Sequence, residues 1–210
     1  MPFGYPVYLE LRGKRVVVIG GAAVRERKVE SLLAAGADDV IVVVPDVIEV
    51  PADARVERRA WRPHDLDGAF LVIASSDDPA ERDAIAREAR DRGALVNVMD
   101  DVANCDWAAP AVVRRGDLAI AISTGGRSPA LARRLREELE DRFGEEWGPV
   151  LEVLREVREE TLPELPDLAD RSRRWNEALD LDEAAMLARE GRANELSARL
   201  RERLLAGVPR

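Results

Sequence analysis

The sequence predicts a Rossmann-like, doubly wound α/β domain followed by a small connecting α/β segment and a helical C-terminal domain. Short apolar runs rich in β-branched residues, typical of buried parallel strands, recur in the first half of the chain. Helical stretches alternate with these runs, and the two clearest end at a glycine. After about residue 147 only charged amphipathic helices remain. We therefore expect three parts, over residues 1–112, 113–146 and 147–210.

The first strand–turn–helix–strand unit occupies the N-terminal part of the chain. Residues 15–19 are the first expected strand, and a pair of glycines ends it. Residues 24–35 carry apolar side chains at helical spacing and stop at Gly36, a natural C-terminal cap. Residues 40–44 are the second strand, so a right-handed crossover should join two parallel strands.

The same pattern then repeats. Residues 69–74 are a third strong strand, and residues 78–81 supply the N-cap, proline and glutamate that start a helix. That helix should end near Gly93 and lead into a strand at 94–98. The weaker stretch 55–58 reads as an edge strand.

The pattern of apolar and charged residues changes after Pro110. Residues 117–122 suggest another strand, and Ser128-Pro129 caps a helix. The apolar residues of that helix fall on one face, at Leu131, Leu135, Leu139 and Phe143.

Composition excludes several classes of protein. The 210 residues carry a net charge of −9, which argues against a general nucleic-acid binder because such proteins need a basic face. No apolar run approaches the roughly 18 residues of a membrane helix, and the N-terminus lacks a secretory pattern. A single cysteine, Cys105, excludes an intramolecular disulfide, so we expect a cytoplasmic protein.

A glycine turn lies between the first strand and the first helix. Small residues there let a dinucleotide pyrophosphate approach the helix N-terminus. The usual fingerprint has glycine at positions one and three and a small residue at six, where this chain has Gly20, Ala22 and Arg25. A tight turn without a ligand is the alternative. Asp46 stands where a carboxylate would bind the adenine ribose and favour NAD over NADP, although it could equally be an ordinary surface residue. The candidate cofactor-binding residues are Gly20, Gly21, Ala22, Ala23, Val24, Pro45, Asp46, Ser75 and Ser76.

Two aspartates, Asp100 and Asp101, follow the expected strand at 94–98. Ligands of open α/β sheets bind beyond the carboxyl ends of the strands, so a carboxylate there is well placed for general acid/base catalysis. The alternative is that these residues only cap the following turn.

A second loop, residues 123–129, enters the helix of the connecting segment. Its two glycines, hydroxyls, arginine and helix N-terminus are typical of a loop that binds carboxylate or phosphate. A helix start without a ligand is the alternative, but further cations lie nearby at Arg114, Arg115, Arg133 and Arg134. The candidate substrate-binding residues are Thr124, Gly125, Gly126, Arg127 and Ser128.

The remaining reactive residue types suggest structural roles. His64 is the only histidine and follows a proline in a polar loop, so we expect no histidine-based metal site and no Ser-His-Asp triad. No metal ligand is assigned. Cys105 and the four tryptophans are expected to pack rather than to bind.

Taken together, these segments resemble the precorrin-2 dehydrogenase/sirohydrochlorin ferrochelatase family, whose module also forms the N-terminal part of bifunctional siroheme synthases. The order and spacing hold over about residues 5–143, and residues 173–205 are more loosely similar to the family's helical C-terminus. The Ser-Thr-Gly-Gly stretch is the most specific feature. The resembling stretches are Tyr5–Leu9, Gly20-Gly21 with Arg27-Lys28, Ala74–Asp78, Asn97–Asp100, Cys105–Trp107 and Ser123–Ala132.

The resemblance implies NAD-dependent oxidation of precorrin-2 to sirohydrochlorin, on the route to siroheme or cobalamin. Some family members also insert Fe²⁺ or Co²⁺ as a substrate. Asp100 matches the family's catalytic aspartate, which could serve both reactions. The many carboxylates of precorrin-2 would account for the arginines around residues 124–128. The resemblance also implies a homodimer and, since no methyltransferase domain follows, the stand-alone form of the module.

Three positions depart from the family pattern. Members usually have a glycine in place of Ala22 and a small residue in place of Arg25, and some have serine in place of Thr124. The departures at Ala22 and Arg25 lie in the glycine turn, so they are the ones that could change the affinity for the cofactor. Two alternatives therefore stay open: a chelatase with weakened NAD use, and a non-catalytic nucleotide- or tetrapyrrole-binding module that would not need Asp100.

Overall fold

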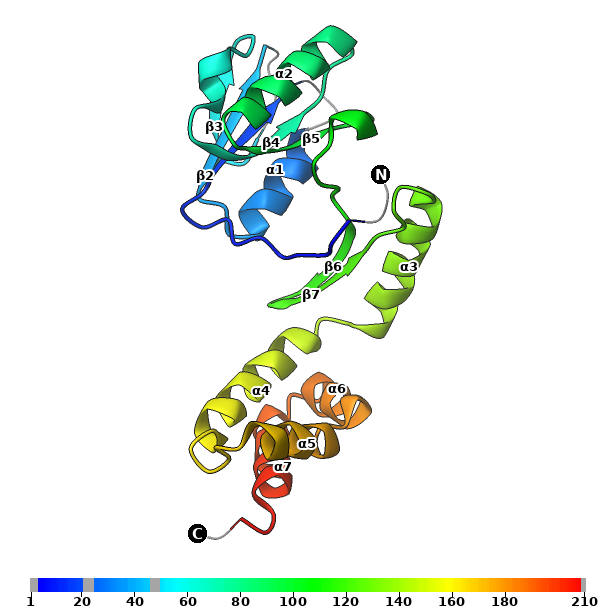
Figure 1. The fold of residues 1–210 in the computed structure, drawn as a ribbon. Helices are drawn as coiled ribbons and strands as arrows, with labels where there is room; N and C mark the ends of the chain where they lie inside the picture. The colour runs from blue at the N-terminus through cyan, green and yellow to red at the C-terminus, as the bar shows by residue number, and fades with distance from the viewer. Residues whose placement is uncertain (1–3, 21–24, 46–49, 209–210) are drawn as a thin grey trace. The chain divides into compact units, whose positions relative to one another are not determined.

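The computed structural model describes residues 4–20, 25–45 and 50–208 (Figure 1). The chain forms two compact units, Met1–Ala109 and Pro110–Arg210. Each unit has its own buried apolar core. The three-part division expected from the sequence stays a prediction.

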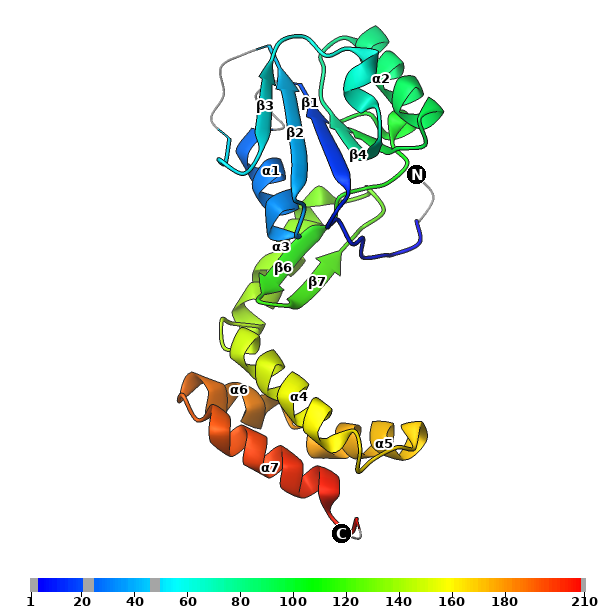
Figure 2. The ribbon, with the colours of Figure 1, turned by 90° about the vertical axis from the view of Figure 1, so that its left-hand side faces the viewer.

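The N-terminal unit is built on a parallel sheet of five strands in the order β3-β2-β1-β4-β5. The strands β3, β2, β1 and β4 lie side by side in Figure 2. The chain runs outward from β1 in one direction through β2 and β3, and in the other through β4 and β5. The topological switch point therefore lies between β1 and β4. The strands are β1 (Arg15–Ile19), β2 (Asp39–Val44), β3 (Arg55–Arg58), β4 (Ala69–Ala74) and β5 (Leu95–Val98).

Two helices, α1 (Arg25–Ala34) and α2 (Pro79–Asp91), cover the faces of this sheet. Val17 of β1 belongs to the same buried cluster as Ile85 of α2. Val18, the next residue along β1, belongs to a second cluster with Val29 of α1. Successive strand residues point to opposite faces, so a strand covered on both sides must be apolar throughout. This explains the continuous apolar runs in the sequence.

The helix ends follow the signals in the sequence. The Asp78 side chain accepts a hydrogen bond from the backbone N–H of Ala80 at 2.9 Å, which caps α2. Gly93 ends the same helix with φ +77°, a conformation that glycine adopts without strain. Short 3₁₀ turns, η2 (Pro63–Leu66) and η3 (Val102–Asn104), complete the unit.

The C-terminal unit contains an antiparallel two-stranded sheet and five helices within its described residues, 110–208. The expected strand at 117–122 is observed as β7, and the helix capped by Ser128 as α3. The sequence reasoning did not foresee β6, which pairs with β7. The core of the helical part includes Val150, Leu187 and Leu200. The elements are β6 (Ala111–Arg115), β7 (Leu118–Ile122), α3 (Pro129–Arg142), α4 (Trp147–Thr161), α5 (Leu168–Ala178), α6 (Leu181–Arg189) and α7 (Ala193–Leu205).

The predicted fold class is therefore confirmed: a Rossmann-like parallel sheet precedes a small α/β element and a helical region. Among residues 4–20, 25–45 and 50–208, no helix is long and apolar enough to span a membrane.

Candidate functional site

The carboxyl ends of three strands meet at the switch point of the sheet. In register, Ile19 of β1 pairs with Ala74 of β4, and Ala74 pairs with Val98 of β5. The segments that follow continue this contact, because the Ser75 N–H donates to the Ile19 carbonyl at 2.9 Å and the Met99 N–H donates to the Ala74 carbonyl at 2.8 Å. Gly20, Ser75 and Asp100 consequently leave the sheet along one edge.

Gly20 packs so tightly that no other residue fits. A Cβ at this position would lie 1.9 Å from the carbonyl oxygen of Ser75, and the backbone φ is +113°. Its N–H donates to the Val43 carbonyl at 3.1 Å, so the turn is fixed between β2 and β4. A glycine is therefore required for this tight turn, at the point where the fingerprint expects its first glycine.

Ser76 is held by the first turn of α2. Its hydroxyl donates to one carboxylate oxygen of Glu81, and the other oxygen accepts from the indole N–H of Trp61 at 2.9 Å. The Ser76 oxygen also accepts from the backbone N–H of Asp78 at 3.1 Å. With its proton committed to Glu81, Ser76 offers a ligand an acceptor rather than a donor.

Asp100 is exposed at the end of β5 and has φ +59°, the only positive φ of a non-glycine residue within the described ranges. Aspartate adopts this left-handed conformation at a modest cost, and such strain concentrates at functional sites. The backbone on either side is held: the Met99 N–H donates to the Ala74 carbonyl and the Asp101 N–H to the Val98 carbonyl at 3.2 Å.

Asp101, in contrast, points back into the protein. One of its carboxylate oxygens accepts from Asn104 Nδ2 at 3.0 Å and from Arg82 Nε at 3.1 Å. These hydrogen bonds, from Asn104 first and then from Arg82, lower the pKa of Asp101. Asp101 therefore stays ionised and committed to its partners, while its neighbour Asp100 remains available.

Cys105 joins the loop after β5 to the strand itself. Its sulfur lies 3.1 Å from the Val98 carbonyl oxygen and 3.2 Å from that of Asp101, and it accepts from the Val98 N–H at 3.3 Å. Asn97 donates to the Trp107 carbonyl at 2.8 Å from the same side. Burial raises the pKa of the thiol, as expected for a structural cysteine.

Part of the predicted cofactor site lies outside the described residues: Gly21, Ala22, Ala23, Val24 and Asp46. The structure places Gly20, Ser75 and Ser76 together at the switch point and exposes Pro45 just after β2. Lys28, on α1, is half-buried, and its burial lowers its pKa.

The second predicted site, residues 124–128, forms the turn before α3. The Thr124 hydroxyl donates to the Ser128 carbonyl at 3.1 Å and accepts from the Ser128 N–H at 3.2 Å. The Ser128 hydroxyl in turn caps α3 by accepting from the Leu131 N–H at 3.2 Å. The hydroxyls thus shape the turn, and the Arg127 side chain is left exposed.

The surrounding arginines contribute less free positive charge than their number suggests. Arg133 and Arg134 pair with Glu137 and Glu138 one turn later on α3, and Arg115 lies 3.4 Å from Glu145. Within the described part of the chain, Arg114 and Arg127 form no ion pair. Arg127 is therefore the cation most available to an anionic ligand at this turn.

Sequence reasoning missed the roles of Glu81, Arg82 and Trp61. Glu81 was taken only as a helix-start signal, but its carboxylate binds Ser76 and Trp61. Sequence spacing gives no hint of these partners, because they depend on how α2 packs against the sheet. Among the described residues, no group of three His, Cys, Asp or Glu side chains is arranged to hold a metal ion.

Comparison with known proteins finds matching family models in both halves of the chain. A family model described as "Putative NAD(P)-binding" matches residues 7–111, and one described as "Sirohaem biosynthesis protein central" matches residues 115–142. Siroheme synthase 1 of Pectobacterium atrosepticum is 34% identical over 205 residues, which cover 95% of this chain and 42% of that protein. The siroheme synthase of Methylococcus capsulatus is 35% identical over 195 residues, covering 90% and 41%.

The chain therefore spans less than half the length of these curated relatives. The solved structure of "SirC, precorrin-2 dehydrogenase" has the same fold, with a TM-score of 0.61 and 24% sequence identity. The match covers 95% of this chain and 100% of that one.

Proposed function

We propose that this chain, which belongs to the family of siroheme-biosynthesis proteins with an NAD(P)-binding domain, oxidises precorrin-2 to sirohydrochlorin with NAD. The observation that carries this proposal is the exposed Asp100 carboxylate at the strand end beside the switch point. Oxidation removes a hydride and a proton from the ring system. Asp100 is the group at this edge that takes the proton.

The residues at the switch point fit a dinucleotide. Gly20 brings the backbone of the β1 turn against β4 without a side chain, and α1 begins just beyond this turn, so its N-terminal dipole favours a pyrophosphate. Ser75 and Ser76 line the same edge, and Asp46 would hold the adenine ribose. When bound, NAD supplies the hydride acceptor. The protein's own contribution is to hold the reacting groups together and to remove the proton.

The turn at residues 124–128 supports an anionic substrate. Arg127 is exposed and unpaired among the described residues, and precorrin-2 carries many carboxylates. We infer that Arg127 binds one of them, with Thr124 and Ser128 shaping the turn through their hydrogen bonds. Arg127→Ala should raise the KM for precorrin-2 by roughly tenfold, the value of one charge-assisted hydrogen bond. An unchanged KM would remove Arg127 from the substrate site.

We also propose that the protein is a cytoplasmic homodimer. Leu131 and Leu135, one turn apart on the apolar face of α3, are 50% and 36% exposed. A second copy of the chain would bury them. Light scattering coupled to size-exclusion chromatography should give twice the mass of 23.2 kDa, and Leu131→Glu should reduce it to the monomer value.

Anaerobic incubation of the purified protein with precorrin-2 and NAD tests the activity. Sirohydrochlorin absorbance should appear with the wild-type protein and fall by at least about a hundredfold in rate for Asp100→Asn, because general-base catalysis contributes roughly that much. Oxidation at the wild-type rate by Asp100→Asn would show that another group takes the proton.

Metal insertion is the second candidate function. Removing pyrrole protons needs a base but no resident metal, so the exposed Asp100 suits this reaction too, with Fe²⁺ or Co²⁺ as substrate. A chelatase with weakened NAD use is suggested by Ala22 and Arg25, because both depart from the family pattern in the cofactor-binding turn. Metal insertion into sirohydrochlorin without NAD-dependent oxidation would favour the chelatase. Absence of both activities from the wild-type protein would favour a non-catalytic binding module.

A further inference from the structure

We propose that Arg82 is a positioning residue for Asp100: its guanidinium ties the turn after β4 to the turn after β5 and so fixes the aspartate at the cofactor edge. This inference rests on the proposed function, in which Asp100 takes the proton. Arg82 itself is not placed in contact with substrate or cofactor.

The guanidinium of Arg82 holds two separate loops. Its Nη1 donates to the Ser76 carbonyl at 2.9 Å, and its Nε donates to Asp101 Oδ2 at 3.1 Å. Both Arg82 and Asp101 are largely buried, with 24% and 18% of their side chains exposed. A planar group with fixed donor directions sets the separation of the loops as well as attracting them.

Asp100 has little else to hold it. Its side chain forms no hydrogen bond with any residue in the described ranges, so the carboxylate stands where its backbone puts it. That backbone is in the left-handed region at φ +59° and is flanked by the hydrogen bonds of Met99 and Asp101. A change at Asp101 therefore transfers directly to its neighbour, and small displacements of a catalytic group cost large factors in rate.

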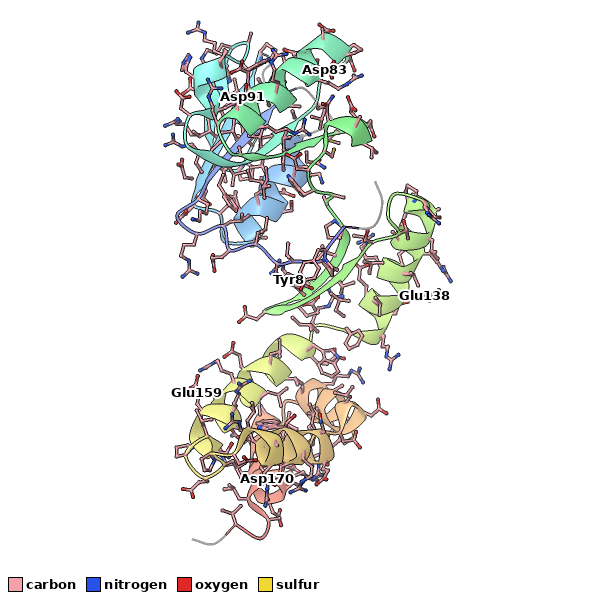
Figure 3. All side chains as sticks on the ribbon, viewed as in Figure 1. Tyr8, Asp83, Asp91, Glu138, Glu159 and Asp170 are labelled. Carbon is pink, nitrogen blue, oxygen red and sulfur yellow. The ribbon has the colours of Figure 1, made fainter. Side chains whose placement is uncertain are left out.

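The same helix supplies a matched control. Arg90 donates to Asp106 at 2.9 Å, and Asp106 accepts from the Val96 N–H at 3.0 Å. This pair also joins α2 to the segment that follows β5, but it does not reach the turn that holds Asp100. Figure 3 labels Asp83, the neighbour of Arg82, in the second turn of α2 and Asp91, the neighbour of Arg90, at its end. Arg90 and Asp106 are somewhat more exposed, at 39% and 28%, so loss of this pair shows the effect of releasing α2 from that segment at a point away from Asp100.

Steady-state kinetics of Arg82→Gln, Arg82→Lys and Arg90→Gln at saturating NAD tests the proposal. Arg82→Gln should lose roughly tenfold or more in kcat, with the KM for precorrin-2 changed by less than about threefold. Arg82→Lys should recover only part of the lost kcat, because a single ammonium cannot reproduce the planar guanidinium that donates to two loops in fixed directions. Arg90→Gln should keep kcat within about twofold of the wild type, the change expected of a site that does not couple to the chemistry.

If Arg82 acts through Asp101, the two substitutions should not add. The double variant Arg82→Gln/Asp101→Ala should have the same kcat as Asp101→Ala alone, because without the Asp101 carboxylate Arg82 has no link to the turn that holds Asp100. Additive losses would mean that Arg82 acts by another route and would overturn the proposal. Equal losses of kcat in Arg82→Gln and Arg90→Gln would also overturn it, because they would indicate a general loss of stability.

A measurement without turnover separates this inference from the proposed function. Hydrogen exchange of the backbone amides at 99–104 should be faster in Arg82→Gln than in Arg90→Gln, whether or not the protein oxidises precorrin-2. If the wild type is inactive but this difference is seen, the proposed function fails, and the inference that Arg82 ties the two turns together stands. Unchanged exchange together with wild-type kcat in Arg82→Gln would overturn that inference.

Discussion

Gly20 shows how one missing side chain shapes the site. Its substitution by alanine would place a Cβ 1.9 Å from the backbone carbonyl of Ser75 and impose a positive φ on an L-residue. Neither the clash nor the strain can relax without separating the turns after β1 and β4. Gly20→Ala should lower the free energy of unfolding by at least about 2 kcal/mol and abolish NAD binding, as measured by urea unfolding and calorimetric titration.

Gly36 provides the control for that prediction. It also has a positive φ, +85°, but an added Cβ would meet nothing within 4 Å. Gly36→Ala should therefore cost only the conformational strain, about 1 kcal/mol, and leave NAD affinity unchanged. Equal loss of NAD affinity in the two variants would mean that the contact between Gly20 and Ser75 is not what the site requires.

Cys105 should be a slow thiol. Burial raises its pKa, and its sulfur is engaged by the backbone of Val98 and Asp101. Because the thiolate is the reactive form, alkylation by iodoacetamide at pH 8 should be at least about tenfold slower in the native protein than in guanidinium chloride. Mass spectrometry of the labelled peptide gives both rates, and equal rates would show that the thiol is accessible and unperturbed.

Sequence position was enough to nominate some residues of the candidate site and not others. Gly20 and Asp100 stand at the ends of strands, and a strand end can be recognised from the pattern around it. Their roles in binding and catalysis stay predictions. Glu81 and Arg82 could not be found this way, because their partners lie on loops that only the packed sheet brings within reach. In the sequence, Arg133 and Arg134 stand out as cations near the loop, and the structure pairs them with Glu137 and Glu138.

At the scale of elements, helix boundaries were easier to predict than isolated strands. The expected helix at 24–35 is observed as α1 (Arg25–Ala34), and the caps at Asp78 and Ser128 start α2 and α3. The strand β6 was missed because it owes its structure to pairing with β7, and only Val113 among its residues is buried. A strand without a continuous apolar run leaves little periodic signal in a sequence.

The end of α7 depends on an arginine from α5. Arg174 Nη1 donates to the carbonyls of Leu204 and Ala206, each at 2.8 Å, and 18% of its side chain is exposed. These carbonyls lack helical partners and attract a positive charge. Arg174→Gln should lower the free energy of unfolding by roughly 2 kcal/mol, the value of hydrogen bonds to a charged group.

The adjacent Arg173 tests that interpretation. It pairs with Asp170 and Glu177 on its own helix and is more than half exposed. Exposed pairs of this kind contribute little, so Arg173→Gln should have a much smaller effect on the urea midpoint than Arg174→Gln. Similar midpoints for the two variants would mean that Arg174 does not cap α7.

At the scale of the whole molecule, the two units differ in how far ion pairs accompany their apolar cores. The N-terminal unit relies on a sheet that is apolar on both faces, a property that the sequence shows directly. The helical part of the C-terminal unit has an apolar core and, around it, many ion pairs, most of them within one helix and some between helices, such as those of Glu183 with Arg199 and Arg203. A sequence rich in both signs of charge predicts helices but not which charges pair between them. The two units should therefore respond differently to pH.

Acid should unfold the C-terminal unit first. Among the described residues, five carboxylates of this unit have a lowered pKa, against Asp65 and Asp101 in the N-terminal unit. In four of the five, hydrogen bonds from arginines are the leading cause: Glu160, Asp170, Glu183 and Glu195. A carboxylate with a lowered pKa stabilises the fold fully above the pKa of the unfolded chain, about 4, and loses that contribution as the pH falls through the folded pKa.

Two-dimensional NMR during an acid titration can follow both units at once. Below about pH 4, amide signals of α7 should lose their dispersion at a higher pH than those of β1, because the larger share of the stabilising carboxylates lies in the helical unit. Salt at about 0.5 M should narrow the difference, since it screens the exposed pairs. Loss of β1 signals first, or simultaneous loss in both units at every salt concentration, would contradict the view that ion pairs stabilise the helical unit selectively.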